Sequence, residues 1–312
     1  MTELDRYRQA LFAAAAIAAA TMLVLPPLLA FRLDFASFVP VLVLSLIPAF
    51  FLPYATWRGL TALRSVLETT SIGLISTIPV LVFTYAAMRV NMPLADNMLA
   101  AMDRMLGFDW IAFVSLVDRS STLSFALLLG YGSFSFQLLL LPSLLGIAGH
   151  HGRAYLLVLA FLILCAISAA IGLFFPSLGT HQAYGFDPAS LNHVDGYFGH
   201  FFLDSFNAAR SDAMFTLGMS NAAGIVTFPS VHAGVAAICA WAAWPSRWLR
   251  YPFLVLNLLM TVSAITNGAH YLVDIVAGGL VALATVRLVH LFASLFRGDR
   301  GVVAASIPAA AA

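Results

Sequence analysis

The sequence of 312 residues contains no lysine, and all 15 of its basic residues are arginine. Charged residues of every kind make up 9% of the chain, whereas a soluble globular domain carries about 25%. This shortage excludes an ordinary water-soluble enzyme. The net charge of +1 provides no basic field for nucleic acid. With only two cysteines, both inside apolar runs, a disulfide framework and a cysteine-rich zinc site are also excluded.

Hydrophobic residues make up 62% of the chain and form runs long enough to cross a bilayer. The runs lack the alternation of a β-strand, so we expect helices. The sequence predicts an all-α, polytopic membrane protein with about eight transmembrane helices, near residues 10–31, 35–56, 69–88, 122–148, 154–175, 227–244, 251–267 and 271–296. The first run is longer than the apolar part of a signal peptide, so we expect an uncleaved span.

The placement of the arginines predicts the threading, because short cytoplasmic loops carry the excess of positive charge. With both termini in the cytoplasm, nine arginines lie on the cytoplasmic side and five on the other. This orientation places two long segments outside, residues 89–121 and residues 176–226. The first has apolar residues at helical spacing, so we expect a helix along the membrane interface. We expect the second to form a partly packed lid.

Two motifs carry the chemistry, and the predicted threading places both on the outer side of the membrane. Residues 227–234 read Thr-Phe-Pro-Ser-Val-His-Ala-Gly, and residues 267–274 read Asn-Gly-Ala-His-Tyr-Leu-Val-Asp. In the first motif, Pro229 suits the opening position of a helix, where free N–H groups bind anions such as phosphate. There Ser230 would offer its hydroxyl group and His232 a proton.

In the second motif, His270 and Asp274 are four residues apart, so a helix would bring them to one face. A carboxylate that binds one ring nitrogen leaves the other free as a nucleophile or base. Attack on phosphorus by His270 would form a phosphohistidine. His232 would protonate the leaving oxygen and then activate the acceptor. We expect this chemistry to need neither a metal nor a cofactor.

The order Pro-Ser-x-His and then His-x-x-x-Asp resembles the type 2 phosphatidic acid phosphatase superfamily. The fuller motifs, with the stretch Asp103-Arg104-Met105-Leu106-Gly107-Phe108-Asp109-Trp110, are similar to the aureobasidin-resistance branch, which includes fungal inositol phosphorylceramide synthase and bacterial relatives. The resemblance covers residues 100–296. It implies a nucleophilic His270, an orienting Asp274, an acid/base His232 and a six-helix core. We therefore expect two added helices in residues 1–68, the catalytic core in 69–296 and a cytoplasmic tail in 297–312.

The sequence departs from the wider superfamily at the cationic phosphate clamps. The Lys/Arg-rich first motif is missing, and Ser263 is followed by Ala264 where the phosphatases have Ser-Arg. Lipid head-group transferases lack the same cations, which favours a transferase over a phosphatase. Arg210 in the lid is the cation that the sequence offers as a substitute. Neutral donors are predicted on the outer half of the fourth span, at Tyr131, Ser135 and Gln137.

The sequence therefore predicts an enzyme of a bacterial inner membrane that acts on a phospholipid or polyprenyl phosphate at the extracytoplasmic side. A hydroxyl acceptor would make it an inositolphosphotransferase-like transferase, and water would make it a lipid phosphate phosphatase. A proton-coupled transporter is the alternative of another class, but the chain has no internal repeat. A metal site and a Ser230–His270–Asp274 hydrolase triad are weaker alternatives, because neither His-Glu-x-x-His nor Gly-x-Ser-x-Gly is present.

Overall fold

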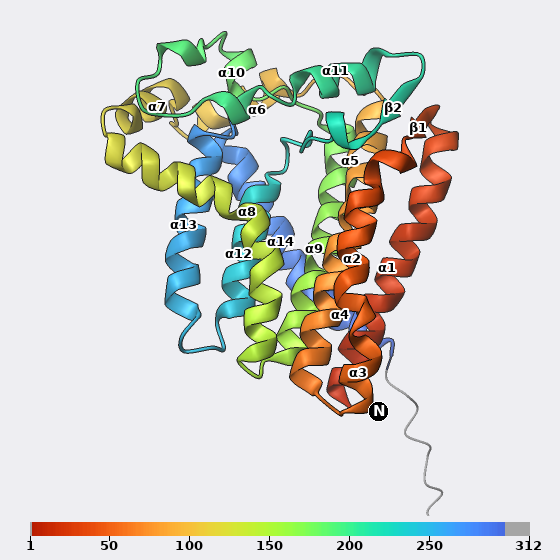
Figure 1. Cartoon of the computed structure of the whole chain (residues 1–312). Helices are drawn as coiled ribbons and strands as arrows, with labels where there is room; N and C mark the ends of the chain where they lie inside the picture. Colours follow the sequence, from red (N-terminus) through yellow and green to blue (C-terminus); the bar gives the residue numbers. More distant parts are fainter. Residues whose placement is uncertain (1, 297–312) are drawn as a thin grey trace, which may run out of the picture.

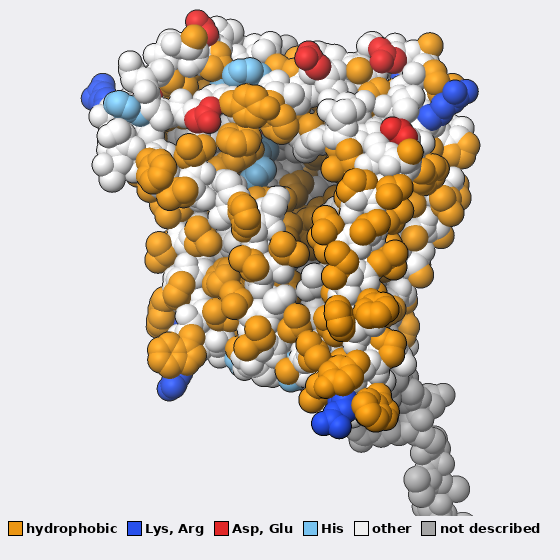
Figure 2. Space-filling model, viewed as in Figure 1, with side chains coloured by type: hydrophobic (Ala, Val, Ile, Leu, Met, Phe, Trp, Pro, Cys, Tyr) orange, Lys and Arg blue, Asp and Glu red, His pale blue; other side chains and the backbone are white. Residues whose placement is uncertain are grey.

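The computed structural model describes residues 2–296, and the predicted tail of residues 297–312 lies outside them. The structure is 75% helical with almost no sheet, which confirms the all-α membrane fold. The long helices stand side by side, and a layer of shorter elements covers the end opposite the N-terminus (Figure 1). Apolar side chains cover the middle of the face seen in Figure 2, and charged side chains gather at its two ends.

Among residues 2–296, six segments are helical and apolar over a length that can cross a membrane. They are α1 (Glu3–Leu28); η1, α2 and α3 (Phe35–Phe38, Val39–Phe50 and Leu52–Trp57); α4 and α5 (Thr61–Ile75 and Thr77–Arg89); α8 (Ser121–Ile147); α9 (His151–Phe174); and α14 (Leu272–Ser294). The other two predicted spans are the shorter apolar helices α12 (Val231–Ala243) and α13 (Arg250–Thr266). With 13 residues, α12 is about 20 Å long, less than the hydrocarbon core of about 30 Å.

Helix α9 is the centre of the bundle. Its apolar residues cover all of its faces, which is typical of a helix that is surrounded by others. Helices α1, α4, α5, α8, α12 and α14 all pack against it. The largest buried cluster therefore runs along α9 and includes Leu157, Leu164 and Cys165.

The third span is broken at Ser76, which ends α4 and precedes α5. Pro79, the third residue of α5, has no N–H to donate to the last turn of α4. The hydroxyl group of Thr77 donates instead to the carbonyl of Leu74 at 2.7 Å. Both halves pack against α9, but α4 also packs against α2 and α8, whereas α5 also packs against α1 and α11.

The outer layer consists of the two segments that the sequence places outside. The predicted interfacial helix is two helices, α6 (Asp96–Met105) and α7 (Trp110–Asp118). The predicted lid contains α10 (Thr180–Ala183), η2 (Pro188–Ser190), η3 (Tyr197–Gly199), α11 (Leu203–Ser211), β2 (Phe215–Leu217) and η4 (Met219–Asn221). Strand β2 pairs in parallel with β1 (Phe31–Leu33), between α1 and η1. The end of the lid is thereby joined to the first two spans.

Candidate active site

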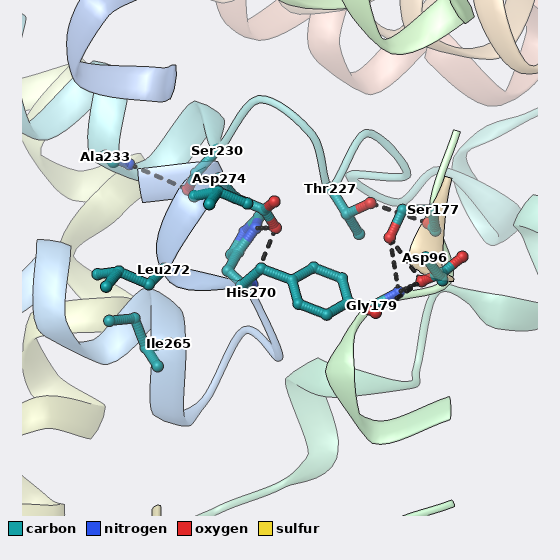
Figure 3. A network of polar contacts seen from close by, with 12 residues as sticks. Asp96, Ser177, Gly179, Thr227, Ser230, Ala233, Ile265, His270, Leu272 and Asp274 are labelled. Carbon is teal, nitrogen blue, oxygen red and sulfur yellow. Dashed lines mark hydrogen bonds and ion pairs between the residues drawn. The ribbon is translucent and has the colours of Figure 1, made fainter. Parts of the chain in front are cut away.

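The first motif forms the start of α12. Ser230 is its N-cap, because the hydroxyl oxygen accepts the N–H of Ala233 at 3.3 Å (Figure 3). The helix therefore begins two residues later than predicted, and Pro229 lies before the cap instead of in the first helical position. Within residues 2–296, the N–H groups of Val231 and His232 have no hydrogen-bond acceptor, as is usual in a first turn. They remain available to a bound anion.

The second motif forms the connection between α13 and α14. Nδ1 of His270 lies 3.1 Å from Oδ2 of Asp274, so the predicted pair is present, although His270 precedes the helix. The same oxygen accepts the N–H of Tyr271 at 3.0 Å. From these hydrogen bonds we assign the ring proton to Nδ1 of His270, which leaves the lone pair of Nε2 free.

The backbones of the two motifs are in direct contact. The N–H of Ser230 donates to the carbonyl of Asp274 at 3.0 Å. A Cβ atom on Gly278 would lie 2.3 Å from the carbonyl oxygen of Ser230, so only glycine permits this approach. Two helix starts that are 41 residues apart in the sequence are thus fixed relative to each other.

A carboxylate from the outer layer caps α14. Asp103 is fully buried and accepts the N–H groups of Leu272 and Val273, each at 2.9 Å. Burial raises the pKa of this carboxyl group, and the two N–H donors oppose the shift. Nearby, the indole N–H of Trp110 donates to the carbonyl of Ile265 at 3.0 Å. Both ends of the stretch 103–110 therefore hold the segment that carries His270.

A second carboxylate joins this segment to the beginning of the lid. Asp96 accepts the hydroxyl groups of Ser177 at 2.8 Å and of Tyr271 at 3.1 Å, and the N–H of Gly179 at 3.1 Å. Burial and the Asp96 carboxylate raise the pKa of Tyr271, so its hydroxyl group stays protonated as a donor. No motif in the sequence marks Asp96, whereas Asp103 opens the stretch 103–110 that resembles the aureobasidin-resistance branch.

His232 and His270 line one cavity of about 540 Å³. Their ring centroids are 6.2 Å apart, so both rings are within reach of a single phosphoryl group in the cavity. The ring of Tyr131 stacks on His232 at 4.2 Å between centroids, and Phe198 of the lid packs on Tyr131 at 4.9 Å. Figure 2 shows a hollow below the outer layer, within the apolar belt. Further polar residues of the lining are Thr77, Thr84, Ser135 and Thr227.

Three of the predicted substrate-binding residues do not line this cavity. Ser230 is buried and caps α12. Gln137 is buried, and its amide group donates to the hydroxyl oxygen of Ser133 at 2.9 Å, on its own helix. The guanidinium group of Arg210 donates to the carbonyl of Met92 at 2.8 Å. Tyr131 and Ser135 do line the cavity.

No arginine lines the cavity within the described part of the chain, and the sequence has no lysine. The phosphate ligands that remain are the free N–H groups of the first turn of α12, the hydroxyl groups and the two imidazoles. Such a set provides hydrogen bonds and at most one positive charge per imidazole. It can therefore compensate one anionic oxygen more readily than two.

Comparison with known proteins gives one match. A family model described as the PAP2 superfamily matches residues 97–288, more than half of the chain. The matched region contains both motifs and the two carboxylates that support them, except Asp96, which lies one residue before it. No curated protein and no solved structure matches the chain. The chain therefore belongs to the PAP2 superfamily, as a membrane enzyme of the phosphatase and phosphotransferase type.

Proposed function

We propose that the protein transfers the phosphoryl-linked head group of a lipid phosphoester to an acceptor hydroxyl group, through a phosphohistidine on His270. The observation that carries this proposal is the arrangement of the two imidazoles. His270 is paired with Asp274 at 3.1 Å and faces His232 across the cavity, at 6.2 Å between ring centroids.

In the first step, Nε2 of His270 attacks the phosphorus atom and forms a P–N bond. The P–O bond to the lipid alcohol breaks, and protonated His232 gives its proton to the departing oxygen. The imidazole of His270 gains positive charge, which the Asp274 carboxylate stabilises through Nδ1–H. The free N–H groups of Val231 and His232 bind the phosphoryl oxygens as negative charge develops on them.

In the second step, neutral His232 accepts the proton of the incoming hydroxyl group. The acceptor oxygen attacks phosphorus, and the P–N bond breaks with its electron pair returning to Nε2 of His270. Both histidines regain their initial states. A lipid or sugar hydroxyl group as acceptor gives a new phosphodiester, and water would give hydrolysis.

The absence of cations favours transfer over hydrolysis of a monoester. A phosphomonoester dianion carries two negative charges, whereas a phosphodiester carries one, and no arginine lines the cavity in residues 2–296. This agrees with the resemblance to the aureobasidin-resistance branch, whose inositolphosphotransferases convert one phosphodiester into another. We place the protein in a bacterial inner membrane with its site at the extracytoplasmic surface, where a phospholipid or polyprenyl phosphate is the donor. A lipid phosphate phosphatase is the second candidate, because water can replace the acceptor hydroxyl group in the second of these two steps.

The test uses purified protein in nanodiscs and a phospholipid that is radiolabelled at phosphorus. We expect an alkali-stable, acid-labile covalent label on the wild-type protein and on the His193→Ala control, whose side chain is exposed on the lid. The label and turnover should both be lost in His270→Ala. Adding a lipid alcohol as acceptor should yield a labelled new lipid instead of the water-soluble head-group phosphate. Turnover by His270→Ala would refute the proposal, and release of free phosphate from a lipid phosphomonoester, without transfer from the phosphodiester, would favour the phosphatase.

A further inference from the structure

A second cavity of about 250 Å³ adjoins the first. The two cavities share Thr77, Phe134, Ser135 and Phe161 as lining residues, so only these side chains lie between them. The second cavity continues between α4, α8 and α9, away from the histidines, past Gly73 and Pro142. Together the cavities form one track that leads from the two imidazoles into the apolar part of the bundle.

The length of this track follows from α8. Tyr131 stacks on His232 at one end, and Pro142 lines the other end. Their separation of eleven positions corresponds to about 16 Å of helix. Just beyond Pro142, the hydroxyl groups of Ser143 and Thr70 are 3.3 Å apart and link α8 to α4 at the inner end of the track.

The chemistry of the track fits a hydrocarbon chain. Leucine, valine, phenylalanine and proline side chains supply most of the inner lining, with three threonines and a serine. The break at Ser76 separates α4 from α5. Residues from both halves of the third span and from α8 line the track. The hollow in Figure 2 lies within the apolar belt, where the surroundings are lipid chains in place of water.

We propose that the inner cavity, which we call the chain chamber, receives one hydrocarbon chain of the substrate lipid and limits the length of chain that is accepted. The lipid phosphate lies at His232 and His270 at the same time, because the two cavities adjoin and share four lining residues. The proposal rests on the proposed function, and it adds a rule for substrate choice: chains that exceed the chamber must leave it or hold the phosphate away from the histidines.

Gly73 offers a way to shorten the chamber. A Cβ atom added to this helical glycine meets only one side-chain atom of Val158, at 4.0 Å, which is ordinary van der Waals contact. Gly73→Leu should therefore fill the chamber without displacing the backbone, and Gly73→Ala should fill it partly. The matched control is Gly279→Leu on α14, where an added Cβ meets nothing within 4 Å and which lines neither cavity.

The experiment measures kcat/KM for didecanoyl and dihexanoyl forms of one phosphodiester in mixed micelles. For Gly73→Leu, we expect the didecanoyl value to fall by about tenfold or more, the range for methylene-sized changes in apolar pockets, and the dihexanoyl value to stay within twofold, about 0.4 kcal/mol. Gly73→Ala should give a smaller loss, and Gly279→Leu should change neither value. Gly132→Leu, in the outer cavity, should lower both. An unchanged didecanoyl-to-dihexanoyl ratio in Gly73→Leu would overturn the proposal.

The same comparison in a His270→Ala background separates the two proposals. Binding of each lipid to this variant reports on the chamber without any chemistry. We expect Gly73→Leu to weaken only the binding of the didecanoyl lipid. Turnover by His270→Ala would contradict the proposed function and leave this binding result valid, whereas equal weakening of both lipids would contradict the chamber alone.

Discussion

At the scale of single residues, the candidate site depends on one carboxylate oxygen. Oδ2 of Asp274 accepts both Nδ1–H of His270 and the N–H of Tyr271, so the carboxylate fixes the ring proton and the orientation of the ring together. Neither task requires Asp274 to touch the substrate. We therefore expect Asp274 to act as a positioning residue, whose loss affects the rate more than the binding.

We expect Asp274→Asn to lower kcat by about 100-fold or more, since a misplaced tautomer removes the nucleophile's lone pair. The amide oxygen can still accept one N–H, so the unfolding temperature and KM should change little. Steady-state kinetics and the rate of covalent labelling from the phospholipid measure the effect. Asp204→Asn, on the exposed surface of α11, serves as the control. A fully active Asp274→Asn would remove the carboxylate from the mechanism.

The sequence could predict this pair because helical spacing alone relates residues 270 and 274. It could not predict the task of Ser230, since a serine before a helix either caps it or binds a ligand, and the choice depends on where the helix begins. Gln137 shows the same limit. Six residues after Tyr131 on α8, it turns to another side of the helix, where the sulfur of Met260 lies 3.6 Å from its amide nitrogen.

At the scale of elements, the sequence predicted which segments form the outer layer, but it did not predict where these segments break or how they are connected to the bundle. The expected helix over 89–121 is two helices because Gly107, with φ of +72°, ends the first, and Asp109 caps the second by accepting the N–H of Ala112. Both signals are local. The pairing of β1 with β2 joins three-residue segments that are far apart in the chain. Segments this short have no hydrophobic periodicity from which the pairing could be predicted.

Arg89 is the main joint between the lid and the first spans, although the sequence showed it only as an outer arginine. Its guanidinium group donates to five backbone carbonyls, those of Leu29, Ala30, Ala209, Asp212 and Ala213. The first two end α1, and the other three end α11. One side chain therefore satisfies the free carbonyls at two helix ends and holds them together.

Replacing Arg89 with Lys should loosen this joint, because a single ammonium group with three donors cannot serve five carbonyls. Losing one charge-assisted bond, worth about 1.5 kcal/mol, should speed amide exchange around residue 212 by about tenfold. Hydrogen exchange followed by mass spectrometry measures this. Arg32→Lys, at an exposed position of β1, should leave the exchange unchanged. Equal rates in Arg89→Lys and wild type would mean that the strand pairing alone holds the lid.

At the scale of the whole molecule, the spans that precede the matched region pack against it and contribute residues to the cavity. At the N-terminal end of the bundle, the buried carboxylate of Glu68 binds Arg8 at 2.7 Å, Arg64 at 3.0 Å and the hydroxyl group of Tyr155 at 2.8 Å. This network joins α1, α4 and α9. Helix α5 supplies one wall of the cavity, although it precedes residue 97. The matched region therefore does not form the whole site.

The distribution of arginine along the molecule supports a single orientation. Within residues 2–296, the end where α1 begins carries Arg6, Arg8, Arg58, Arg64, Arg153, Arg247 and Arg250. The end with the lid carries Arg32, Arg89, Arg104, Arg119 and Arg210, of which Arg89 and Arg210 bind backbone carbonyls inside the protein. The end where α1 begins thus carries seven of these twelve arginines, and it should face the cytoplasm.

A membrane-impermeant maleimide can test this orientation, because Cys165 and Cys239 are both buried and should not react. Ser211→Cys, exposed on the lid, should be labelled in spheroplasts but not in inside-out vesicles. Trp248→Cys, 73% exposed in the loop between α12 and α13, should show the opposite pattern. If the two patterns were exchanged, the two histidines would open toward the cytoplasm. The donor and acceptor would then have to come from the inner leaflet.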